Sequence, residues 1–78
     1  MTLEQARKAA DDYCHRTQLR DYPESIWETA ENISRASFDY RPQHLDDAIV
    51  CWYLMGCPKH AIPADECLML LGRREWQL

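Results

Sequence analysis

The stretch PQHLDDAIVCWYLMGCP, residues 42–58, decides the fold of this chain. Its apolar residues recur at intervals of three and four and share one helical face: Leu45, Ala48, Ile49, Trp52 and Met55. From Val50 to Leu54 the helix is apolar all round, and such a helix lies at the centre of a core or at an interface. Pro42 suits a first helical turn, and Gly56 followed by Pro58 suits the end of a helix. The stretch therefore predicts a central helix over residues 42–55.

Three further helices are predicted, over residues 3–18, 23–38 and 63–71. Thr2 and Gln5 form a capping-box pattern at the first start, Pro23 suits the second start, and Gly72 suits the last stop. The expected inner faces are Leu3, Ala6, Ala10, Tyr13, Cys14 and Thr17 in the first helix, Ile26, Trp27, Ala30, Ile33 and Phe38 in the second, and Ala64, Cys67, Leu68 and Leu71 in the fourth. We expect the third and fourth helices to form the centre, with the first two packed around them.

Length and composition agree with one small domain. The chain has 78 residues, of which 46% are hydrophobic. This is enough apolar material for a compact core that needs no disulfide bonds or structural metal. No strand-like alternation competes with the helical periodicity. We therefore predict an all-α fold, a compact single domain of about four short helices over residues 1–78.

Four residues between the third and the fourth predicted helix, or within them, are of the types that bind metals: Cys51, Cys57, His60 and Cys67. A structural zinc site uses four such ligands, usually as two close pairs. Only Cys57 and His60 make a close pair here, and Cys51 and Cys67 lie in apolar helices, where free cysteine packs as a small hydrophobe. We therefore favour a core role for these cysteines, expect no metal or other cofactor, and keep a zinc-stabilised module as an alternative.

Charge and hydropathy narrow the classes of partner. The net charge is −4, and residues 23–40 hold four acidic residues against one basic residue. No basic stripe is present, which disfavours direct binding to nucleic acid. No signal peptide or apolar run long enough for a membrane is visible, so we expect a cytoplasmic protein that does not bind membranes.

Enzyme chemistry finds little support in the sequence. Two glycines in total exclude both the phosphate-binding loop and the dinucleotide fingerprint. Cys14 and His15 are neighbours on a helix and point about 100° apart, so they do not face each other as nucleophile and base. The neighbouring acidic pairs, such as Asp46 with Asp47, suit helix starts better than acid–base catalysis. We expect no catalytic residues.

Binding to another protein is the function that remains. The third and fourth helices carry more apolar side chains than a core of this size obviously covers, and such a surplus marks either a partner site or a completely filled core. The expected partner-binding residues are Tyr53, Met69, Leu70, Arg73, Arg74 and Trp76, with Glu24, Glu28 and Glu31 facing a basic partner. We predict a stoichiometric inhibitor or regulator of a larger protein or complex, a role of the kind that phages and mobile elements encode in anti-CRISPR and anti-activator proteins.

Two alternatives stand beside this prediction. A homodimeric structural or accessory subunit would pair the same apolar patch with a second copy. A small DNA-binding regulator would use the third and fourth helices as a helix-turn-helix. The connection between them is too long for that motif, and the fourth helix carries no Arg, Lys, Asn or Gln for base edges.

Overall fold

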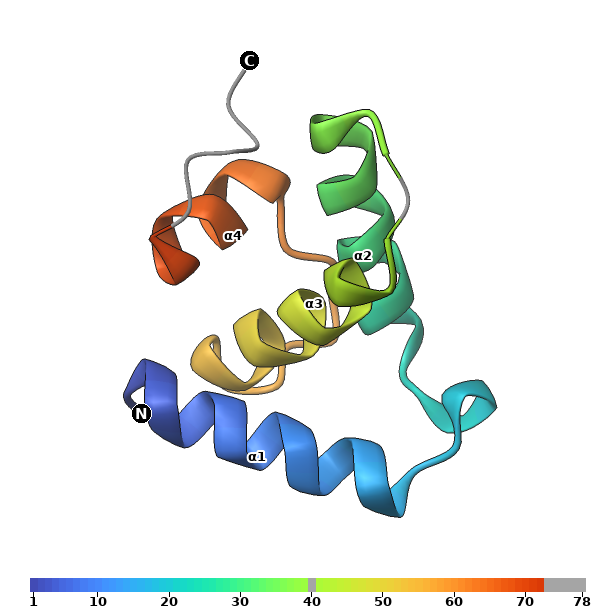
Figure 1. Ribbon diagram of the computed structural model, residues 1–78, viewed down its shortest axis with the longest axis vertical. Coiled ribbons are helices and arrows are strands. Elements are labelled where there is room, and N and C mark those ends of the chain that lie inside the picture. The colour runs from blue at the N-terminus through green and yellow to red at the C-terminus, as the bar shows by residue number, and fades with distance from the viewer. Residues whose placement is uncertain (40, 73–78) are drawn as a thin grey trace.

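The computed structural model describes residues 1–39 and 41–72, and within them the predicted all-α fold is confirmed. These residues form α1 (Leu3–Arg16), the short 3₁₀ helix η1 (Leu19–Asp21), α2 (Glu24–Ser37), α3 (Pro42–Leu54) and α4 (Ala64–Leu71). No helix among them is both long enough and apolar enough to cross a membrane. Figure 1 shows α1, α2 and α4 arranged around α3, with η1 on the connection between α1 and α2.

The centre of the fold is α3. It packs against α1, α2 and α4, while α4 also packs against α2. In Figure 1, α1 runs along one side of α3, and α2 and α4 lie on other sides. The expectation that α3 and α4 share the centre is therefore only half right: α3 alone is central, because α4 has eight residues and reaches fewer neighbours.

The helix ends follow the local signals of the sequence, with small shifts. Thr2 Oγ1 accepts a hydrogen bond of 3.2 Å from the Gln5 N–H, and Gln5 Oε1 accepts one of 2.8 Å from the Thr2 N–H, which is the predicted capping box. Gly72 ends α4 with a φ of +65°, a conformation that glycine adopts without cost. The first helix ends at Arg16 rather than Gln18, and η1 was not predicted.

The core is built from small and branched apolar side chains on all four α-helices, together with Tyr22 and Ile62 from the connections. Its buried hydrophobic members are Ala6, Ala10, Tyr22, Ile26, Ile33, Ala48, Ile49, Val50, Cys51, Ile62, Cys67, Leu68 and Leu71. Ala6 and Ala10 are the buried residues of α1, which packs against α3. The expected inner faces thus supply most of the core.

Three residues expected in the core are exposed instead. Phe38 is 83% exposed, Trp27 41% and Met55 40%. Phe38 is the C-cap of α2 and has a φ of +57°, so its side chain no longer continues the face of the helix. Met55 lies one residue beyond the end of α3, where the helical periodicity no longer applies.

Polar residues of α2 form hydrogen bonds with the connection between α3 and α4. The Thr29 hydroxyl donates to the Ser25 carbonyl at 2.6 Å and accepts from the Ile62 N–H at 2.9 Å. The Asn32 side-chain amide donates to the Ile62 carbonyl at 3.2 Å. Since a buried backbone group without a partner is costly, these bonds allow Ile62 to be fully buried. They fix a connection that contains no regular secondary structure.

Candidate functional site

A groove opens where η1, α2 and the start of α3 meet. Its volume is about 530 Å³, and its apolar walls are formed by Leu19, Trp27, Ala30, Pro42 and Leu45. We call it the Trp27 groove. Leu19 and Trp27 are 56% and 41% exposed although both side chains are large and apolar. Exposed apolar surface that is gathered in one hollow, rather than scattered singly, is typical of a binding site.

The position of Trp27 on α2 explains why it lies in the groove. Ile26 and Ile33 take the face of α2 that is buried in the core, and Trp27 is turned by about 100° from Ile26. The Trp27 ring lies against Tyr22, with 6.1 Å between the ring centroids. The wall that α2 provides consists of residues spaced by three and four, which share one side of the helix: Trp27, Ala30, Glu31 and Ser34.

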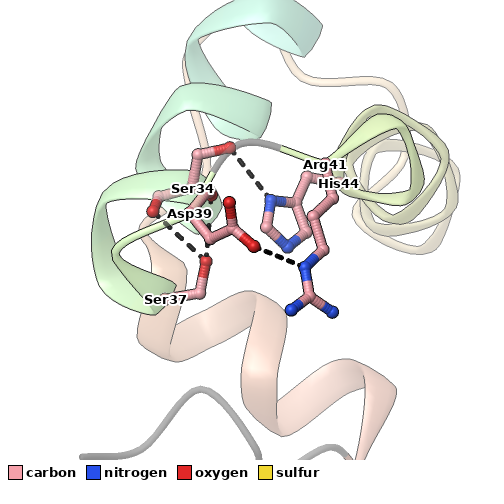
Figure 2. Close-up of polar contacts among 5 residues, drawn as sticks. All are labelled: Ser34, Ser37, Asp39, Arg41 and His44. Carbon is pink, nitrogen blue, oxygen red and sulfur yellow. Dashed lines mark hydrogen bonds and ion pairs between the residues drawn. The ribbon is translucent and has the colours of Figure 1, made fainter.

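A buried polar pair forms part of the groove lining at the corner between α2 and α3. Ser34 Oγ and His44 Nδ1 share a hydrogen bond of 3.0 Å, and both residues are buried. Figure 2 shows the two side chains facing each other across this corner. The bond joins the last turn of α2 to the first turn of α3. It therefore ties together the two helices that frame the groove.

Charged side chains stand around the apolar walls. Arg41 lines the groove, and its Nε donates to Asp39 Oδ2 at 2.6 Å, as Figure 2 shows. Glu31 also lines the groove, and its Oε1 accepts from Arg35 Nη2 at 2.5 Å. Both ion pairs are exposed, so each contributes at most about 1 kcal/mol to stability. Their effect is to place charge beside an apolar hollow.

The acidic row predicted on α2 is exposed and adjoins this groove. Glu24, Glu28 and Glu31 all face solvent. Glu24 precedes Trp27 by three residues and Glu31 follows it by four, so the two acids lie one turn on either side of the indole. Glu28 is a neighbour of both acids on the helix surface. The exposed surface of α2 beside the groove is therefore acidic, and of these three acids Glu31 lines the groove itself.

The other predicted partner-binding residues are not gathered at one site. Tyr53, in α3, is half-buried in an aromatic cluster, with its ring centroid 5.0 Å from that of Trp52 and 6.0 Å from that of Tyr13. Met69 is 81% exposed on α4, and its neighbour Leu70 is half-buried against the core. Three further predicted residues lie outside the described part of the chain: Arg73, Arg74 and Trp76. Of the predicted residues that the structure describes, Glu31 alone lines the groove.

The sequence pattern does not identify most of the residues that line the groove. Leu19 offered one usable signal, because it is an apolar residue between two predicted helices and belongs to neither face. Trp27 and Leu45 were assigned to the core, since periodicity does not separate the middle of an apolar face from its edge. Ser34, Arg41 and His44 gave no signal, because they come together only at the folded corner.

The aromatic cluster beside the core changes the acidity of its tyrosines. The Tyr13 and Tyr22 rings are stacked with 5.2 Å between centroids. Burial raises the pKa of Tyr22 to about 12, and a side-chain hydrogen bond with Cys14 acts in the same direction. Burial likewise raises the pKa of Tyr13 and of Tyr53. These phenols are therefore held in the protonated form, which suits packing rather than proton transfer near neutral pH.

The four potential zinc ligands do not form a cluster. Cys51 and Cys67 are buried in the core, and the Cys51 thiol lies 3.9 Å from the Cys67 carbonyl oxygen. Cys57 and His60 are exposed on the connection that follows α3. None of the four cysteines, all of which the structure describes, forms a disulfide bond with another. Within residues 1–39 and 41–72, no three His, Cys, Asp or Glu side chains are placed to hold a metal ion together.

A second, polar pocket of about 280 Å³ lies between α1 and α3. Arg7 and Asp11 from α1 and Asp46 and Asp47 from α3 line it. Its charges are of mixed sign, and it lacks the exposed large apolar side chains of the Trp27 groove.

Comparisons with protein-family models, with curated proteins and with solved structures found no match to this chain. The assignment of the groove therefore depends on its own geometry. The groove is an apolar hollow with charged residues at its edge and a hydrogen bond between Ser34 and His44 at its corner. Such a hollow is suited to receiving apolar side chains.

Proposed function

We propose that this protein is a small non-enzymatic binding module that occupies a surface of a larger protein, and that the Trp27 groove is its contact. The single observation that carries the proposal is the exposure of Leu19 and Trp27 in one apolar hollow. The role we propose is stoichiometric inhibition or regulation, in which one copy covers one site on the partner.

Trp27 has the properties of an anchor residue for such a contact. Tryptophan is among the residues that dominate binding energy when a partner excludes water from them. A preorganised anchor loses less conformational entropy on binding, and the Trp27 ring packs against Tyr22 with 6.1 Å between the ring centroids. Truncation of Trp27 to alanine should therefore weaken binding by about 2 kcal/mol or more.

The test compares retention of a partner by groove variants and by a matched control. Tagged protein is incubated with host-cell lysate as wild type, Trp27→Ala, Leu19→Ser and Met69→Ala. Met69 is also exposed and apolar but lies on α4 outside the groove. We expect one stoichiometric protein to be retained by wild type and Met69→Ala and lost from both groove variants. Calorimetry with that purified protein should then give a one-to-one complex.

Two results would contradict the proposal. Retention that is lost with Met69→Ala and kept with Trp27→Ala would move the contact to α4. Light scattering that shows a dimer which Trp27→Ala dissociates would make the groove a self-association surface, and the protein would then be a homodimeric subunit instead of a module for another protein.

A further inference from the structure

We infer that the Trp27 groove receives an amphipathic helix of the partner, and that Lys or Arg residues flank the apolar residues of this helix. This inference rests on the proposed function. The occupant is thus defined by its shape and by its charge. Each property comes from a different feature of the groove.

The wall that α2 provides determines the shape of the segment that the groove can receive. Trp27, Ala30, Glu31 and Ser34 cover the wall over two helical turns, a length of about 10 Å. An amphipathic helix presents anchors at the same spacing of three, four and seven residues, so two successive turns of a partner helix match this length. Leu19 at one side and Pro42 with Leu45 at the other form the apolar walls between which these anchors would lie.

Another common way of binding a peptide needs a feature that the described residues lack. Addition of a strand requires an exposed sheet edge, and residues 1–39 and 41–72 contain no strand. The groove lies between helical elements, and helix-in-groove recognition uses that arrangement.

Acidic residues outnumber basic residues on α2 and directly after it. Residues 23–39 hold Glu24, Glu28, Glu31 and Asp39 against Arg35. Arg35 is paired with Glu31, and Arg41 is paired with Asp39. Glu24 and Glu28 are exposed on α2 but do not line the groove. Glu24 lies one helical turn before Trp27, so it places negative charge next to the groove. A complementary helix carries basic residues next to its apolar anchors.

The experiment selects binders from a library of random linear peptides displayed on phage, with the full-length protein as bait. Selected peptides are synthesised, and their affinities are measured for wild type, Trp27→Ala and the double variant Glu24→Lys/Glu28→Lys. The control is Glu4→Lys/Asp12→Lys, which changes the net charge equally on α1. The match is close because Glu4 and Glu24 each lie in the first turn of their helix.

The expected peptides become helical on binding, carry apolar residues at intervals of three and four, and are enriched in Lys and Arg. Trp27→Ala should abolish their binding. The α2 double variant should weaken it about fivefold to tenfold, and the α1 double variant should leave it unchanged. Added salt should weaken binding to wild type more than binding to the α2 double variant.

The remaining outcomes separate the two proposals. Peptides that depend on Trp27 but bind in an extended form, or without basic residues, overturn the helix inference and leave the proposed function standing. Selection that yields no peptide dependent on Trp27 also overturns the inference, and the retention experiment then decides the proposed function by itself. Binding that both charge variants weaken equally would show a general effect of net charge and would overturn the charge argument.

Discussion

Trp27 and Ile33 lie on the same helix, but they differ in what their side chains do. Ile33 is fully buried, whereas Trp27 is 41% exposed and lies at the edge of the groove. Removing a buried branched side chain leaves a cavity that the core fills only in part. Removing a half-exposed side chain leaves a space that water enters.

This difference predicts that Ile33→Ala mainly lowers stability and that Trp27→Ala mainly weakens binding. Ile33→Ala should lower the free energy of unfolding by about 2–5 kcal/mol. Trp27→Ala should lower it by about 1 kcal/mol while removing partner binding. Urea unfolding of the two variants, followed by circular dichroism, measures the first quantity. A loss with Trp27→Ala as large as with Ile33→Ala would mean that Trp27 is a core residue.

Tyr22 predicts how stability depends on alkaline pH. Its pKa in the folded protein is about 12, above the value of about 10 of an unfolded chain. The protonated phenol therefore contributes its full stability below about pH 10, and this contribution is lost as the pH rises toward the folded pKa. The complete loss, reached above the folded pKa, is on the order of 3 kcal/mol.

The measurement is urea unfolding of wild type and Tyr22→Phe at about pH 8 and about pH 11. Tyr22→Phe should lose less stability between the two pH values, because phenylalanine has no proton to release. Some loss should persist, since the pKa values of Tyr13 and Tyr53 are also raised. An identical loss in both proteins would show that Tyr22 ionises as freely as an exposed tyrosine.

At the scale of elements, α2 joins the parts of the fold through buried hydroxyl groups. Thr29 accepts from the Ile62 N–H, and Ser34 bonds His44. One bond holds the connection before α4, and the other holds the start of α3. The amphipathic pattern of α2 thus describes only part of its buried face, because these polar residues lie on that face as well.

Thr29 offers a matched pair of substitutions. Thr29→Val keeps the shape and removes the hydroxyl, which leaves the buried Ile62 N–H without its acceptor and should cost about 1–3 kcal/mol. Thr29→Ser keeps the hydroxyl and removes only a methyl group, so it should cost about 1 kcal/mol. Hydrogen exchange should show lower protection of the Ile62 amide in the valine variant. Equal protection in both variants would mean that the hydroxyl does not hold this connection.

At the scale of the whole molecule, α3 contacts the three other α-helices, so we expect the fold to unfold as one cooperative unit. A domain of this size has a total stability of the order of 4–12 kcal/mol. A single substitution at the centre therefore removes a large share of it. The groove depends on the same centre, because Pro42, His44 and Leu45 reach it from α3.

Ile49 tests this dependence. Its side chain is fully buried on α3, and Ile49→Ala should cost about 2–5 kcal/mol, whereas Ile49→Val should cost about 1 kcal/mol. Because α3 joins the other helices, fluorescence and circular dichroism should report the same unfolding midpoint for each variant. Separate midpoints would show that the helices do not unfold together.

The sequence by itself determined the helices and most of the core. Spacing by three and four identified four α-helices, and Thr2, Pro42 and Gly72 marked their ends, because caps and periodicity depend on neighbours along the chain. The spacing did not locate the edges of the apolar faces. Trp27 and Phe38 have the spacing of core residues, yet Trp27 lines a groove and Phe38 itself adopts the left-handed conformation that ends α2.

Only the tertiary structure decided the position of the candidate site. The Trp27 groove combines Leu19 from η1, one side of α2 and the start of α3, and no local pattern brings these together. The bond between Ser34 and His44 forms only when the corner between α2 and α3 closes. Binding surfaces of this kind depend on the angles between helices, and those angles are set by packing between residues that are distant in the sequence.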